Sequence, residues 1–175
     1  LERLPALCDK HGILLIFDEV ITGFGRLGAN FGAERLGMFP DIMTMAKGLT
    51  SSAVPLGAVG MRPAIAEYFD KNVFYGGLTY NSHPLACAAA LGAIRAYEED
   101  DMIGNARRMG QVMARHHEAL KAKHPSVGLT RSIGLFGILE LVQSRTTMEP
   151  LAPFNGTSDP MKAVNRYFRE HGLYT

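Results

Sequence analysis

Two charged residues, Asp18 and Lys47, each follow a short segment rich in apolar side chains, and together they could do chemistry. The apolar run Leu14–Phe17 ends at Asp18, and the segment Met43–Ala46 ends at Lys47. Short apolar runs bounded by glycine or turn residues are typical of buried parallel strands. In open α/β sheets, ligands bind in the crevice outside the carboxyl ends of the strands. An acid and an amine at two such ends therefore make a candidate site.

The residue types of this pair indicate one particular chemistry. A lysine such as Lys47 at the end of a hydrophobic strand is expected to be partly desolvated, which favours the neutral, nucleophilic amine. Taken singly, Lys47 could merely reach water and Asp18 could merely cap the next turn. An acid at a cationic pyridinium nitrogen, with an amine at the aldehyde carbon across the ring, is the arrangement that pyridoxal phosphate chemistry requires. We therefore expect Asp18 and Lys47 to converge on one aromatic ring.

The elements that must position this pair alternate between strands and helices. Strands are expected over 13–17, 42–46 and 55–61, and helices over 1–11, 30–36, 64–69 and 85–97. This alternation predicts a doubly wound α/β layer. The helix over 85–97 is rich in alanine and almost free of polar residues, so it is expected to be buried.

The composition changes beyond Pro125, which indicates a second and smaller α+β domain. The pattern predicts an amphipathic helix over 102–124, strands over 127–131 and 135–142, an irregular loop over 143–159 and a last helix over 160–172. We expect residues 1–104 to be the C-terminal half of a large domain, and 105–175 to hold a linking helix and part of the small domain. Because the chain starts inside a helix without methionine, we expect an internal piece of a longer protein.

Charge and cysteine content narrow the class of partner. The 175 residues carry 18 basic and 17 acidic side chains with no block of like charge, so neither nucleic acid nor an anionic membrane surface is expected as a partner. No apolar run reaches the length of about 18 residues that a membrane span needs. Cys8 and Cys87 lie far apart and are expected to be buried thiols, and the histidines show no metal-ligand pattern, so no metal is expected. The default location is the cytoplasm.

A literal G-x-G-x-x-G spans residues 23–28 and raises the alternative of a dinucleotide-binding fingerprint. In that fingerprint the first glycine turns directly off the strand and a helix opens at the third. Here Asp18 to Thr22 intervene after the strand, and the residues after Gly28 are a poor helix start. A structural glycine loop is the favoured interpretation, and a nicotinamide-binding domain remains the alternative.

The residues that carry a family resemblance extend over most of the chain. They are Ile16–Val20, Gly23–Arg26, Pro40–Ile42, Ala46–Leu49, Pro55–Val59 and Thr79–Ala88. In order and spacing this set resembles the class III pyridoxal-phosphate aminotransferases. The resemblance is specific from Ile16 to Ala90 and looser beyond Met102. It implies a fold-type I architecture, with part of a large doubly wound domain and part of a small α+β C-terminal domain.

The resemblance implies a role for each of several residues. Lys47 resembles the lysine that holds the cofactor, pyridoxal 5'-phosphate, and then moves a proton between substrate and cofactor. Asp18 resembles the acid that keeps the ring nitrogen protonated, and Val20 the side chain packed against the ring. Thr79 resembles a phosphate ligand that reaches across a dimer interface into the neighbouring site. Arg26 is expected to be structural, with substrate binding as the alternative.

The resemblance also implies an activity. The expected reaction transfers an amino group from an amino acid, ω-amino acid or amine to an oxo acid, with pyruvate the expected acceptor, in a homodimer. Many members have glutamine at the position of Ile21. In having isoleucine there, this chain resembles the branch that acts on ω-amino acids and taurine. The alternatives are a decarboxylase or aminomutase of the same family, or a non-catalytic, split relative acting as an interaction partner. Because family segments that complete the site are missing, the 175-residue piece is expected to be inactive alone.

Overall fold

The computed structural model describes residues 3–174, which divide into two compact units. Unit 1 comprises the chain up to Gly110 together with Ile133–Phe136, and unit 2 comprises Gln111–Ser132 and the chain from Gly137 onward. The candidate site lies entirely in unit 1. The expected domains, 1–104 and 105–175, stay a prediction. No helix among the described residues is both long and apolar enough to cross a membrane.

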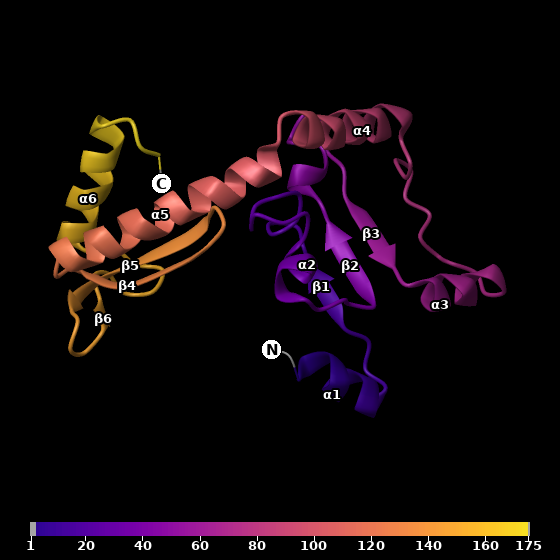
Figure 1. Cartoon of the computed structure of the whole chain (residues 1–175), viewed down its shortest axis with the longest axis horizontal. Helices are drawn as coiled ribbons and strands as arrows, with labels where there is room; N and C mark the ends of the chain where they lie inside the picture. The colour runs from indigo at the N-terminus through magenta and orange to yellow at the C-terminus, as the bar shows by residue number, and fades with distance from the viewer. Residues whose placement is uncertain (1–2, 175) are drawn as a thin grey trace. The chain divides into compact units, whose positions relative to one another are not determined.

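A three-stranded sheet forms the centre of unit 1 (Figure 1). Its strands, in spatial order, are β1 (Ile16–Asp18), β2 (Ile42–Met45) and β3 (Ala58–Met61). β1 runs parallel to β2, with Asp18 paired to Thr44, whereas β3 runs antiparallel to β2. The carboxyl ends of β1 and β2 therefore meet at one edge of the sheet, as the sequence pattern requires.

A polar cluster around Asp41 fixes the opposite edge of this sheet. One Asp41 carboxylate oxygen accepts a hydrogen bond from the Leu15 amide at 2.8 Å, and the other lies 3.3 Å from the Arg62 guanidinium. Arg62 also donates to the carbonyls of Phe39 and Pro40. Since these residues flank all three strands, the cluster holds the strands in register where β1 and β2 begin and β3 ends.

The helices of unit 1 begin and end at ordinary sequence signals. They are α1 (Leu4–His11), α2 (Gly32–Leu36), α3 (Pro63–Ala66), the 3₁₀ turns η1 (Lys47–Leu49) and η2 (Glu67–Asp70), and α4 (Pro84–Glu99). α1 ends at Gly12 with φ +63°, a left-handed C-cap, and α4 begins at a proline in its first turn. Residues 1 and 2 of the expected first helix lie outside the described residues.

Three burial expectations are wrong. In α4 Ala86 and Ala90 are buried, but Leu91 is 60% exposed, because the helix packs on the rest of unit 1 along one side. In β1, expected to be buried on both faces, Ile16 is 57% exposed within the described chain. Cys87 is exposed whereas Cys8 is buried. Apolar composition indicates that a residue can be buried, but the surrounding elements decide whether it is.

Unit 2 combines the end of a long helix with a second sheet. Its elements are the later turns of α5 (Met102–Lys123), then β4 (Val127–Ile133), β5 (Phe136–Ser144), β6 (Glu149–Pro150) and α6 (Asp159–Glu170). The sheet order is β4-β5-β6, with β5 and β6 antiparallel. The short β6 lies within the expected irregular loop. The Ser158 hydroxyl accepts from the Met161 amide at 3.3 Å and caps α6.

Candidate active site

Asp18 lies at the carboxyl end of β1, next to Thr44 of β2. Its Oδ1 accepts a hydrogen bond from the Val20 amide at 3.0 Å, so Asp18 does cap the turn that follows the strand. The side chain is exposed, and among residues 3–174 it forms no ion pair and Oδ2 accepts no hydrogen bond. Capping thus uses one oxygen and leaves the second free for a ligand.

Lys47 follows β2 at the same edge of the sheet and opens the 3₁₀ turn η1. Its backbone is left-handed, with φ +44°, which is uncommon for a residue with a side chain. Lys47 is exposed, so the expected desolvation is wrong for the described residues. Its side chain instead extends from a strand end without an ion-pair partner in the described part of the chain. The amine is therefore free to meet a ligand.

A cavity of about 590 Å³ lies beside Lys47, within the size range of small-molecule sites. Its wall includes Val20, Ile21, Phe24, Lys47, Ser51 and Tyr97. The structure thus brings Lys47 and Val20 to one cavity. The expected convergence of Asp18 and Lys47 on one ring stays a prediction. Asp18 shares the sheet edge but is not among the residues lining the cavity.

Thr79 lies in the segment that leads into α4, and it is exposed. The turn around it is held by the Asn81 amide, which donates to the Leu78 carbonyl, and by the Asn81 side chain, which donates to the Gly76 carbonyl at 2.6 Å. Thr79 does not line the cavity beside Lys47. Within this one chain, its hydroxyl faces solvent in an ordered turn.

The glycine-rich loop over 23–28 is a packing surface for α5. A Cβ added at Gly25 would lie 2.9 Å from the Ile103 side chain, and one at Gly28 would lie 3.1 Å from the Arg107 Cα. Arg107 also donates to the Gly28 carbonyl at 3.0 Å. Both glycines have positive φ, and the next helix begins at Gly32 and not at Gly28. These contacts support the structural interpretation of the loop over the dinucleotide fingerprint.

The backbone and the side chain of Arg26 have different surroundings. Its carbonyl accepts a hydrogen bond from the Leu135 amide at 2.9 Å, which is a structural role of the backbone. Its side chain is exposed and lines the cavity beside Lys47. The substrate-binding alternative for Arg26 therefore stays open.

Sequence reasoning missed two residues that support the site. Glu19 is 1% exposed, and its carboxylate accepts from the amides of Gly32 and Ala33. The Asp-Glu doublet contained a signal, because neighbouring residues of a strand face opposite sides, so one of the two acids is expected to point inward. The second missed residue, Tyr97, donates to the Gly48 carbonyl, and no local pattern predicts a contact between residues 49 positions apart.

Comparison with known proteins identifies the family of this chain. All 175 residues match the family model described as aminotransferase class-III. The chain is 49% identical to an omega-aminotransferase of Caulobacter vibrioides, over 81% of this chain and 33% of that protein. It is 39% identical to a putrescine–pyruvate aminotransferase of Pseudomonas aeruginosa, over 97% and 36%.

A solved structure shows the same fold. It is a taurine:2-oxoglutarate aminotransferase from Bifidobacterium kashiwanohense in complex with PLP and glutamate, and this chain is 40% identical to it. The TM-score is 0.94, over 99% of this chain and 39% of that one. The expected α/β architecture of fold type I is thereby confirmed. The chain spans about a third of the length of the curated relatives it matches.

Proposed function

This chain belongs to the class-III aminotransferases, and from that premise we propose that the whole protein is a transaminase dependent on pyridoxal 5'-phosphate. It moves an amino group from an amino acid, ω-amino acid or amine to an oxo acid, with pyruvate as the acceptor. The observation that supports this most directly is the position of Lys47, which opens into a cavity at the sheet edge where Asp18 ends β1.

The residues at this edge fit the cofactor by their chemistry. Lys47 is an amine without an ion-pair partner in the described chain, and Asp18 has a carboxylate oxygen without a hydrogen bond there. When bound, pyridoxal phosphate acts as an electron sink for bonds at the substrate α-carbon. In the proposal, Lys47 Nζ would hold the cofactor and would then hold and move the proton of that carbon. Asp18 would accept a hydrogen bond from the ring nitrogen and keep it protonated, and Val20 would pack against the ring.

We further propose a cytoplasmic homodimer in which Thr79 serves the site of the partner subunit. Thr79 lies in an exposed turn within a stretch of uncovered apolar side chains, namely Val73, Phe74, Tyr75, Leu78 and Tyr80. Exposed aromatic side chains of this kind are enriched where proteins meet. A hydroxyl near the start of α4 is suited to donate to a phosphate oxygen. Cell fractionation tests the location.

The donor preference of the proposed enzyme is for amines and ω-amino acids. Ile21 lines the cavity beside Lys47 and is 49% exposed, so this part of the wall offers an apolar surface to the carbon chain of a donor. A screen of the whole protein with taurine, β-alanine, diamines and α-amino acids, each with pyruvate or 2-oxoglutarate, tests donor and acceptor together. Release of carbon dioxide, or an amine shifted within one molecule, would instead identify a decarboxylase or aminomutase.

One labelling experiment tests the assignment itself. The whole protein is incubated with pyridoxal phosphate and reduced with borohydride, and its peptides are analysed by mass spectrometry. We expect a pyridoxyl group on Lys47, none in the Lys47→Ala variant, and an unchanged yield in Lys71→Ala, which removes an exposed lysine of the same unit. No adduct at Lys47 would refute the proposal and leave the non-catalytic relative. Nicotinamide cofactor binding that survives Lys47→Ala would point to the dinucleotide alternative.

A further inference from the structure

The backbone of Lys47 is in a conformation that its surroundings must maintain. A left-handed residue with a side chain costs roughly 1–2 kcal/mol, and such strain persists only where neighbouring contacts fix it. The 3₁₀ turn supplies part of this support, because the Leu49 amide donates to the Ala46 carbonyl at 3.0 Å. The Thr50 amide donates to the Lys47 carbonyl at 3.3 Å. The Ser51 amide donates to the Gly48 carbonyl at 3.2 Å.

Tyr97 supplies a support from outside the turn. Its hydroxyl donates to the carbonyl of Gly48, the residue after Lys47, at 2.6 Å. Tyr97 belongs to α4, which contacts η1 past the carboxyl end of β2 (Figure 1). Since a helix of 16 residues is stiffer than a loop, this bond ties the turn to a fixed reference. The orientation of the peptide that follows Gly48 is thereby set by an element far away in sequence.

The Phe24 side chain packs against the Gly48 backbone. A Cβ added at Gly48 would lie 2.8 Å from the Phe24 Cβ, so the Phe24 side chain directly touches the Gly48 backbone. The Phe24 ring is 6.3 Å from the Tyr97 ring and packs edge-on against Phe31 at 5.4 Å. Gly48 is therefore held between Phe24 and the Tyr97 hydroxyl. It cannot rotate without breaking one of these contacts.

We propose that Tyr97 is a positioning residue for Lys47, its hydroxyl holding the left-handed turn that directs the lysine side chain to the cavity. This inference rests on the proposed function, in which the Lys47 amine must meet one carbon atom and then one proton. Proton transfer requires the two heavy atoms to be within hydrogen-bond distance, and a displacement of about 1 Å can cost on the order of a hundredfold in rate. Tyr97 acts through the Gly48 carbonyl and touches no reacting atom.

The first test compares Tyr97→Phe with wild type in the cofactor-loaded whole protein. Phenylalanine keeps the ring that lies near Phe24 and removes only the hydroxyl. Because a hydrogen bond between neutral groups is worth a factor of roughly 2 to 13, we expect kcat to fall by that factor. KM for the amino donor should stay within about twofold, since Tyr97→Phe keeps the ring that lines the cavity and the lost hydroxyl was bonded to the Gly48 carbonyl. The control Tyr68→Phe removes an exposed hydroxyl of the same unit and should leave both constants unchanged.

The second test needs neither cofactor nor turnover. Hydrogen exchange of the cofactor-free whole protein is measured at the Leu49 and Thr50 amides, which donate to the Ala46 and Lys47 carbonyls within the turn. In Tyr97→Phe the turn should open more often, and these two amides should exchange about fivefold faster, the ratio expected for one lost hydrogen bond. The Glu19 amide, which donates to the Thr44 carbonyl, should not change. Equal exchange of the Leu49 and Thr50 amides in Tyr97→Phe and wild type would overturn the inference.

The outcomes separate the two proposals. If wild type gives no pyridoxyl adduct on Lys47, the proposed function fails, while the hydrogen-exchange test still decides the role of Tyr97. If the adduct forms but kcat and hydrogen exchange are the same in Tyr97→Phe, only the positioning role fails. Should Tyr97→Phe unfold, wild type alone decides, because a turn tied to α4 should be protected at least as well as the Asp100 amide, which donates to the Ala96 carbonyl at the end of that helix. Weaker protection of Leu49 and Thr50 than of Asp100 in wild type would contradict the inference.

Discussion

Glu19 Oε1 accepts a hydrogen bond from the Ala33 amide at 2.6 Å, although the two residues lie 14 positions apart. The other oxygen, Oε2, accepts from the Gly32 amide at 2.9 Å and from the Thr22 hydroxyl. A carboxylate that is 1% exposed has lost its hydration, and the three hydrogen-bond donors compensate for that loss. The bonds tie the end of β1 to the start of α2, so they also close the loop that supplies Val20 and part of the cavity wall.

Replacing this buried acid should destabilise unit 1. In Glu19→Gln one oxygen becomes an NH₂ group that faces a backbone N–H, so a donor meets a donor and the charge is lost. Hydrogen bonds to charged groups are worth roughly 1.5–3 kcal/mol, and we expect the free energy of unfolding to fall by about 2 kcal/mol or more. Urea unfolding of the whole protein measures the change. Glu67→Gln, at an exposed position whose side chain forms no hydrogen bond within residues 3–174, should change it by less than about 0.5 kcal/mol.

Two glycine-to-alanine substitutions should have effects of opposite sign. At Gly28, φ is +77° and an added Cβ would lie 3.1 Å from the Arg107 Cα, so alanine should cost about 1–3 kcal/mol in unfolding free energy. At Gly92, inside α4, an added Cβ meets nothing within 4 Å, and alanine should add about 0.5–1 kcal/mol. Thermal or urea unfolding tests both. A stable Gly28→Ala protein would contradict the close approach of α5 to the loop.

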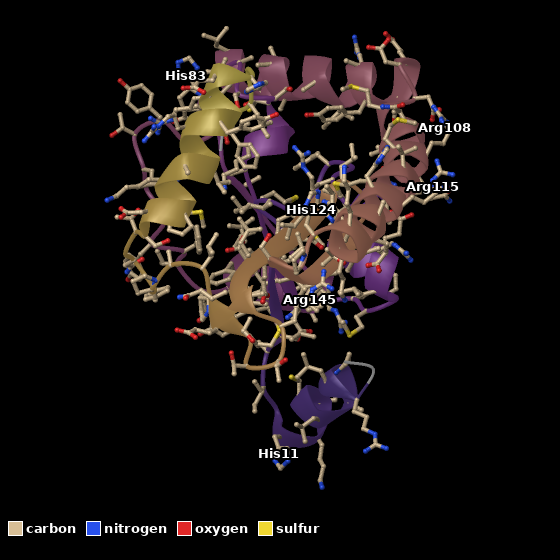
Figure 2. The ribbon with its side chains drawn as sticks, turned by 90° about the vertical axis from the view of Figure 1, so that its left-hand side faces the viewer. His11, His83, Arg108, Arg115, His124 and Arg145 are labelled. Carbon is tan, nitrogen blue, oxygen red and sulfur yellow. The ribbon has the colours of Figure 1, made fainter. Side chains whose placement is uncertain are left out.

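Arg145 should stabilise the end of α5 within unit 2. Its guanidinium donates to the Val127 carbonyl at 2.9 Å and to the carbonyls of His124 and Lys121, the last of which belongs to the final turn of the helix; Figure 2 labels Arg145 and His124. A cation at a helix C-terminus satisfies carbonyls that have no partner within the helix. Because most of these bonds are exposed, we expect Arg145→Ala to cost about 1–2 kcal/mol.

Hydrogen exchange localises that loss. The amides of His124 and Val127, which donate to the Leu120 and His124 carbonyls, should exchange faster in Arg145→Ala. The control Arg131→Ala removes an exposed pair with Glu140 at 3.7 Å and should leave their protection unchanged. Equal protection of these amides in Arg145→Ala and Arg131→Ala would mean that the end of α5 is stable without the Arg145 side chain.

Mixing two defective subunits tests the proposed dimer. Lys47→Ala should be inactive, and Thr79→Ala should bind the cofactor weakly because a phosphate ligand is lost. If Thr79 serves the partner site, a hybrid dimer contains one site with Lys47 from one subunit and Thr79 from the other. Unfolding and refolding an equal mixture should then restore activity above that of either parent. No recovery, with dimers still formed, would place Thr79 in the site of its own chain.

The strand ends and the local elements were predictable from the residues. Apolar runs followed by Asp18 and Lys47 predicted two neighbouring strand ends, and β1 and β2 run parallel with Asp18 beside Thr44. Gly12 predicted the end of α1, and Pro84 the first turn of α4. These signals are local, because the backbone preferences of glycine and proline act within a few residues. Expected and observed elements accordingly agree within a few residues for most of the chain.

Burial was the part that local patterns could not decide. The Ala-rich composition of α4 predicted a covered helix, yet Leu91 is exposed, and Lys47 is exposed where desolvation was expected. Cys87 is another exposed residue of an apolar type. Whether a side chain is covered by protein or exposed to water depends on segments distant in sequence. Hydrophobic periodicity does not predict which of those segments pack against it.

By itself, the sequence determined which residue types stand at the strand ends, where the chain turns, and which family it resembles, because these depend on neighbours along the chain. Only the tertiary structure decided that Glu19 is buried under two amides of α2 and that Tyr97 holds the peptide after Gly48. Both contacts join residues far apart in the chain. Their formation depends on how the elements pack in space, and no spacing in the sequence specifies that packing.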